Sequence, residues 1–324
     1  MAEALFARAA VSHVAQAPTT AERRTDSLLR SVAWSCAFLV IALVAYLVLE
    51  IGDQARPAIE RFGLDFITGT TWDTVGDVYG VLPEIWGTLY SSLIALLLGG
   101  AFGIGIAVFI TQGFIYWRIA ATFRVVIELL AAIPSVVFGL WGIYVLIPAL
   151  RPVADWLHQH FGMVPLFDTS LNGPGLAPAA IVLAVMILPT VAAISVDALR
   201  RVPFSVTEAA YAMGTTRAEA IFRVMLPTAS SGILAALVLG FGRALGETMA
   251  LAMLIGNNNQ INLSLFAPAN TLAARLASSF PEADKSEVQA LMFAALVLLA
   301  VTLLVNVLGL GVQQLAMRKF EAKR

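Results

Sequence analysis

Arg243 and Glu247 are the two residues of this sequence whose types and spacing could form an anion site, in which the Arg243 guanidinium binds the anion and Glu247 holds the guanidinium while the site is empty. They lie four positions apart in an apolar run, so a helix there would place them on one face. The planar guanidinium of an arginine donates parallel hydrogen bonds and suits a tetrahedral oxyanion. Two compatible interpretations stay open: Arg243 contacts a passing anion, or the two charges neutralise each other as a buried structural pair.

A second candidate site is the polar segment 199–230. Ser205 and Thr216 are each followed three residues later by a glutamate, the spacing of a capping box, which predicts two short helices. Gly214 is placed to end the first helix, and Pro227 to end the second. We expect a helix–turn–helix element that can contact another protein, although an ordinary loop between membrane spans has the same pattern.

Both candidate sites lie within a chain whose composition is that of a membrane protein. It has 324 residues, of which 59% are apolar and 13% charged, with a mean hydropathy of +0.85. Soluble domains have about 45–50% apolar and about 25% charged residues. Apolar runs long enough to cross a bilayer predict six spans, at about 31–51, 85–110, 123–150, 177–198, 231–255 and 288–313. The predicted fold class is an all-α integral membrane protein with six transmembrane helices.

The distribution of basic residues predicts the orientation of these spans. With the N-terminus in the cytoplasm, the inner segments hold 14 of the 20 lysines and arginines, the outer segments 5, and Arg243 lies within a span. Cytoplasmic loops carry such an excess. We therefore expect a cytoplasmic tail at 1–30, a membrane domain at 31–315 and a second cytoplasmic tail at 316–324. The net charge of −1 argues against a nucleic-acid partner.

Other polar residues give weaker predictions. Glu128 and Ser135 fall within the third predicted span, where Pro134 is expected to bend the helix and Ser135 to bond freed backbone groups. For Glu128 a structural pairing is the favoured interpretation. His158 and His160, like His13, are expected outside the bilayer as surface residues, and no metal site is predicted. None of the three lysines follows a glycine, so no ATP-binding P-loop is present and no catalytic residues are predicted.

Two strings of residues resemble a known family. Glu208-Ala209-Ala210, then Gly214, Val224 and Leu226-Pro227, match the EAA loop of ABC importer permeases, with Val224 in place of the usual isoleucine. The run from Gly240 to Ala250, which contains Arg243 and Glu247, resembles the PstC family of permease subunits of phosphate-specific ABC importers, as do Glu128–Val137 and Asn270–Leu272. The resemblance covers roughly residues 30–315.

The resemblance implies a type I ABC importer permease (MetI-like) fold and a transporter subunit that is not an enzyme. It implies that Arg243 and Glu247 line a phosphate path with alternating access, and that the EAA loop docks on an ATP-binding subunit. The chain would need no cofactor, while the partner ATPase uses ATP and Mg. Implied partners are a PstA-like second permease, a dimer of PstB-like ATP-binding subunits and a PstS-like extracytoplasmic phosphate-binding protein, in a bacterial inner membrane.

Two rival functions remain at this point. A permease for another oxyanion, such as sulfate or molybdate, would share the EAA loop. A secondary transporter or channel would work without ATP, and the EAA string argues against it.

Overall fold

The computed structural model describes residues 19–321 of the chain, which divides into two compact units, Met1–Asp53 and Gln54–Arg324. The predicted tail at 1–30 and His13 therefore lie largely outside the described residues. The first unit consists, in its described part, of most of helix α2 (Thr20–Phe62). This helix begins before the predicted span at 31–51 and ends after it, because good helix-forming polar residues flank the apolar run on both sides.

The second unit is mostly helical. Among its described residues, 54–321, the one small sheet is the antiparallel pair β1 (Trp72–Asp73) and β2 (Val78–Tyr79), with Trp72 opposite Tyr79. The main helices of this unit are α4 (Leu82–Thr111), α5 (Trp117–Ala132), α6 (Ser135–Trp141), α7 (Ile147–Phe161), α8 (Leu176–Arg200), α12 (Ser230–Leu245), α13 (Met249–Leu254), α14 (Leu272–Ser279) and α15 (Lys285–Glu321). Shorter elements are α3 (Asp65–Thr68), α9 (Phe204–Ala212), α10 (Arg217–Glu219), α11 (Leu226–Thr228) and the 3-10 turn Phe280–Glu282.

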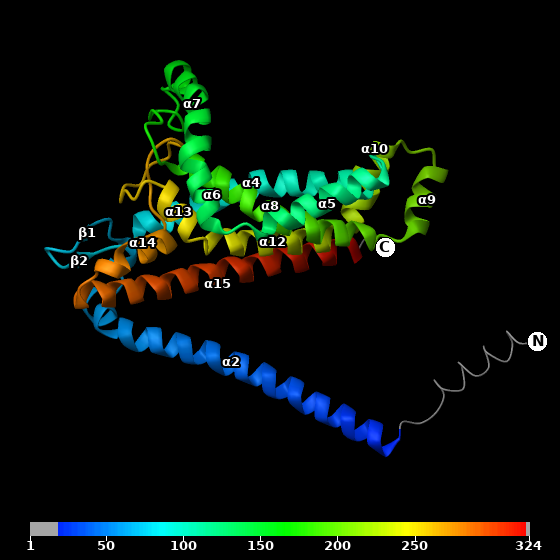
Figure 1. Cartoon of the computed structure of the whole chain (residues 1–324), viewed down its shortest axis with the longest axis horizontal. Coiled ribbons are helices and arrows are strands. Elements are labelled where there is room, and N and C mark those ends of the chain that lie inside the picture. The colour runs from blue at the N-terminus through cyan, green and yellow to red at the C-terminus, as the bar shows by residue number, and fades with distance from the viewer. Residues whose placement is uncertain (1–18, 322–324) are drawn as a thin grey trace, which may run out of the picture. The chain divides into compact units, whose positions relative to one another are not determined.

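Glycines bring α4, α8 and α12 close together. A Cβ added at Gly99 would lie 2.6 Å from the Ala184 carbonyl oxygen, and one at Gly103 would lie 3.0 Å from the Val191 Cβ. A Cβ added at Gly240 of α12 would lie 2.8 Å from the Cγ2 of the same Val191. Small residues drive helix association in membranes because they let backbones approach. Helix α15 then packs along α12, as Figure 1 shows.

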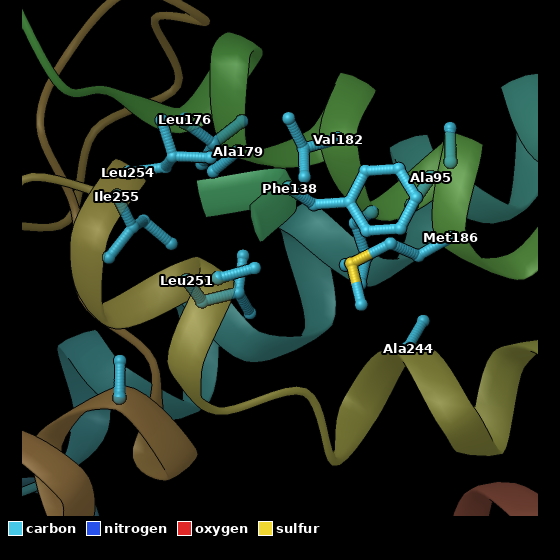
Figure 2. Packing of buried hydrophobic residues seen from close by; sticks show 14 of the residues in the cluster. Ala95, Phe138, Leu176, Ala179, Val182, Met186, Ala244, Leu251, Leu254 and Ile255 are labelled. Carbon is cyan, nitrogen blue, oxygen red and sulfur yellow. The ribbon is translucent and has the colours of Figure 1, made fainter. Parts of the chain in front are cut away.

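The apolar core of this unit is built where α8 meets α6 and α13. Figure 2 shows Phe138 of α6 next to Met186 of α8, and Leu251, Leu254 and Ile255 in another part of the same cluster, towards Leu176. These side chains are at least nine-tenths buried, with Leu254 and Ile255 fully so. The core fixes α13 against the helices that surround it.

The third predicted span, at 123–150, differs from the structure. Helix α5 ends at Ala132, Ile133 and Pro134 are extended, and helix resumes at Ser135. The sequence predicted a bend at Pro134. The helix is interrupted there because proline lacks an N–H and disfavours helix in the residue before it. From Ser135 the helix continues through a π-helical turn (Gly142–Leu146) to Phe161, so residues 151–161 are helix and not loop.

The fifth predicted span, at 231–255, is also not one continuous helix. Helix α12 ends at Leu245 and α13 begins at Met249. Helix α12 instead follows the segment Arg217–Thr228 at a bend of 71°. Within the described residues, five helices are long and apolar enough to cross a membrane, or six if this bent pair is one span.

Candidate functional site

Arg243 lies in the last turn of α12 and its side chain is exposed within this chain. Its Nη1 donates a hydrogen bond to the Thr190 Oγ1 of α8, at 3.1 Å. The two side chains lie at an open hollow of about 590 Å³. The hollow is lined by Thr190, Leu239, Gly242, Arg243, Thr302 and Asn306.

Glu247 does not pair with Arg243. Its Oε1 accepts a hydrogen bond from the Ala250 backbone N–H at 3.3 Å, at the start of α13, and no ion pair joins it to Arg243 in residues 19–321. The prediction of a shared helical face is therefore wrong. The four-residue spacing aligns side chains only within a continuous helix, and α12 ends at Leu245 before Glu247 is reached.

The segment 199–230 forms the expected helix–turn–helix, with one difference. Helix α9 ends just before Gly214, whose φ of +80° is the left-handed conformation that favours glycine. Thr216 and Glu219 form the second capping box. The first box is absent, because α9 already begins at Phe204 after Pro203, which leaves Ser205 inside the helix.

The residues of the EAA string lie on both sides of this turn. Glu208 and Ala209 are exposed on α9, whereas Ala210 is buried. Val224, Leu226 and Pro227 are half-buried. Glu208 and Ala209 are therefore available for a partner, while Ala210 holds α9 to the rest of the element.

Pro227 does not end the second helix, contrary to prediction. A π-helical turn (Ala220–Met225) leads directly into α11, so Pro227 lies inside the helical segment Arg217–Thr228, one residue before its end. The chain bends only after Thr228.

Glu128 and Ser135 have no observed role at the hollow. Glu128 pairs with Arg124 across one helical turn at 3.3 Å, with both side chains about half exposed, which agrees with a structural pairing. Ser135 is the first residue of α6, and none of the hydrogen bonds found in the described part of the chain uses its hydroxyl. The ring nitrogens of His158 and His160 lie against the backbone oxygens of Phe167 and Trp156, and the described residues hold no cluster suited to a metal.

A buried ion pair was not predicted from the sequence. The Arg275 Nε and Nη2 of α14 donate to the Glu84 Oε1 of α4 at 3.1 and 2.9 Å. Glu84 is fully buried, and Arg275 also contacts the Asn259 side chain and lies 5.1 Å above the Trp72 ring. The two residues are 191 positions apart and both fall between predicted spans, so only the fold brings them together.

Sequence analysis also missed Thr190 and Asn306 at the hollow. Each is a polar residue within an apolar run, at 177–198 and 288–313. This position could have identified both residues from the sequence, because polar side chains inside a membrane span are functional candidates.

This chain is similar to known transport proteins in both sequence and fold. A family model described as binding-protein-dependent transport system inner membrane component matches residues 99–321. The phosphate transport system permease protein PstC of Xylella fastidiosa is 38% identical over 278 residues, which cover 84% of this chain and 85% of that protein. The protein of the same name from Haemophilus influenzae is 36% identical, covering 88% of this chain and 91% of its own length.

Solved structures resemble the fold at lower identity. One is a bacterial ABC transporter involved in the import of the acidic polysaccharide alginate, with a TM-score of 0.59 and 15% identity over 90% of this chain and 99% of that one. Another is an inward-facing conformation of the MetNI methionine ABC transporter, with a TM-score of 0.55 and 18% identity over 73% and 95% of the two chains.

Proposed function

Since the chain belongs to the family of binding-protein-dependent transport system inner membrane components, we infer that it is the membrane-spanning permease subunit of an ATP-driven importer of inorganic phosphate. The observation that carries this conclusion is its similarity to phosphate transport permeases over more than four-fifths of its length. It favours phosphate over the sulfate or molybdate alternative. The chain has the fold of ABC importer permeases of the MetI-like type and is a multi-pass membrane protein, not an enzyme.

Arg243 is the proposed phosphate-contacting residue of the translocation path. Its guanidinium is exposed at the open hollow. The Glu247 carboxylate does not pair with it, because it accepts a hydrogen bond from the backbone at the start of α13. An arginine exposed in a membrane span is costly when it faces lipid, so such residues face a water-filled path or another chain. Glu247 belongs to the path through its position in the break between α12 and α13, where it holds the backbone that follows Arg243.

The EAA loop is the proposed coupling element. Glu208 and Ala209 present one charged and one small residue on an exposed helix face, and Gly214 fixes the angle to the next helix. Glu208, Ala209, Ala210, Gly214, Val224, Leu226 and Pro227 together form the proposed contact and support for an ATP-binding subunit. Motion of that subunit would then reach α12 directly, because the bend at Ala229 joins the loop to this helix.

The importer needs an ATPase and a substrate-binding protein besides this chain. We propose that these are a PstB-like dimer, which uses ATP and Mg, and an extracytoplasmic PstS-like protein, with a PstA-like chain as second permease. Both termini and the loop 199–230 are placed in the cytoplasm of a bacterial cell, on the strength of the charge distribution. The division into tails at 1–30 and 316–324 and a membrane domain between them belongs to the same proposal.

Reconstitution tests the function. The complex of this chain with its partners, in proteoliposomes that contain ATP, should import labelled phosphate and hydrolyse ATP faster when the binding protein carries phosphate. Sulfate and molybdate serve as control solutes. Equal stimulation and uptake with sulfate or molybdate would contradict the assignment to phosphate.

A further inference from the structure

Asn306 is a polar side chain in the middle of an apolar helix, and the described part of the chain offers it no hydrogen-bond partner. It lies in α15 between apolar neighbours on both sides. An amide at membrane depth is tolerated where it is buried in protein or lines a polar cavity. Asn306 lines the Arg243 hollow. A Cβ at Gly242 would lie 3.1 Å from the Asn306 Oδ1, so this glycine lets the amide rest on the α12 backbone next to Arg243.

Thr190 differs from the other threonines of these long helices. The hydroxyls of Thr88, Thr111 and Thr302 each donate to a carbonyl of their own helix, at 2.7, 2.8 and 2.9 Å. The Thr190 hydroxyl instead accepts from Arg243, and in residues 19–321 it makes no such bond to its helix. A hydroxyl carries one donor besides its acceptor positions, so Thr190 keeps a proton to donate into the hollow.

We propose that Thr190 and Asn306, together with Arg243, form a three-sided phosphate subsite in the translocation path; this deepens the proposed function and rests on it. Arg243 supplies the positive charge, and Thr190 orients its guanidinium and donates a hydrogen bond. The Asn306 amide both donates and accepts, which matches an anion that carries bare oxygens and a hydroxyl. Three helices, α8, α12 and α15, thereby contribute one polar group each.

The test compares Thr190→Val and Asn306→Leu in the fully assembled complex, because both changes keep the side-chain size and remove only the polar groups. At saturating phosphate-loaded binding protein, each variant should lower the maximum rate of phosphate uptake about tenfold or more, the effect of losing a hydrogen bond to a charged group. The half-saturating phosphate concentration should stay unchanged if the binding protein sets it. Protein abundance and stimulated ATP hydrolysis should persist, so more ATP is used per phosphate imported.

Thr122→Val is the matched control, since the Thr122 hydroxyl bonds back to the Arg118 carbonyl at 3.0 Å on α5, away from the hollow. Asn306→Gln should recover part of the uptake, because it keeps the amide. Wild-type uptake rates in Thr190→Val and Asn306→Leu would overturn the subsite. If Asn306→Leu fails to accumulate, Asn306→Ser replaces it, and a normal rate in that variant overturns the subsite equally. If the wild-type complex does not import phosphate, the proposed function fails instead.

Discussion

At the scale of single residues, the sequence singled out Arg243 as a candidate but did not predict its surroundings. A lone arginine in an apolar run can be recognised from the sequence alone as a functional candidate, because a charged side chain is costly in lipid. Its bond to Thr190, and the capping of α13 by Glu247, depend on where α12 ends and how α8 packs. The pair Glu84–Arg275 could not be predicted, since its partners meet only after α4 and α14 have packed.

Arg243→Gln is expected to lower phosphate uptake by about ten- to a hundredfold, because hydrogen bonds to charged groups contribute about 1.5–3 kcal/mol. Protein abundance should stay near normal, since Arg243 is exposed and not paired with Glu247. Arg243→Lys should retain partial uptake, because it keeps the charge and loses the planar fork. Uptake assays in membrane vesicles, normalised to the amount of protein, measure both effects.

Glu247→Gln provides the comparison. A glutamine oxygen can still accept the Ala250 N–H, so we expect normal abundance and at most a modest loss of uptake. The variant Arg243→Gln with Glu247→Gln should remain as defective as Arg243→Gln alone. Full phosphate uptake by this double variant would show that Arg243 is a structural residue.

Arg275→Met is expected to destabilise the protein strongly, because it leaves the Glu84 carboxylate buried without a partner. Breaking a buried pair in this way costs about 3–5 kcal/mol. The double variant Glu84→Gln with Arg275→Met should regain most of the stability, since no charge then stays unpaired. Thermal unfolding of the purified complex in detergent should show a lower midpoint for the single variant than for the double, and equal midpoints would argue against the pair.

At the scale of elements, some boundaries followed from local chemistry and others did not. The break between α5 and α6 was predictable because Pro134 interrupts the backbone bonding there. The break between α12 and α13 carries no proline, and the apolar run 231–255 looks continuous, so the packing of α13 into the core decides it. The turn at Gly214 was predictable because a single residue determines it.

Gly214→Val should weaken coupling between ATP hydrolysis and transport. The φ of +80° is strained for a β-branched residue, so the angle between α9 and α10 must change. We expect a complex that assembles poorly or hydrolyses ATP without importing phosphate, as measured by copurification and uptake. Gly214→Asn is the control, since asparagine tolerates the left-handed conformation and should keep most of the activity. Normal assembly and transport in Gly214→Val would exclude this turn as the coupling joint.

At the scale of the whole molecule, composition alone predicted a helical membrane protein, and the family resemblance supplied its fold. Six spans were expected, and the described residues contain five long candidates, or six if the bent pair Arg217–Thr228 and Ser230–Leu245 is one span. The bounds of the spans differ from prediction, because hydropathy measures the amount of apolar residue and does not register breaks or bends such as the 71° one at Ala229. Orientation rests on charge alone and needs its own test.

Single cysteines in a Cys36→Ala background should report that orientation. A cysteine at the exposed Glu282 is expected to react with an impermeant thiol reagent from outside sealed cells, and one at the exposed Ala218 only after permeabilisation. A cysteine at Ala218 leaves the neighbouring capping box intact, since that box uses the side chains of Thr216 and Glu219. Reaction of the Ala218 cysteine in sealed cells would reverse the assignment of the two sides.

The early end of α12 has a consequence for how long the phosphate that we propose to bind at Arg243 would stay there. The peptide dipoles of a helix add up to about half a negative charge at its C-terminus, and Arg243 lies in that last turn. The dipole stabilises the guanidinium while the hollow is empty and offsets part of its attraction for an arriving anion. A site on a path must hold its ion loosely enough to release it. At the proposed subsite, ending the helix at Leu245 would therefore favour a short dwell time of the anion and its rapid passage.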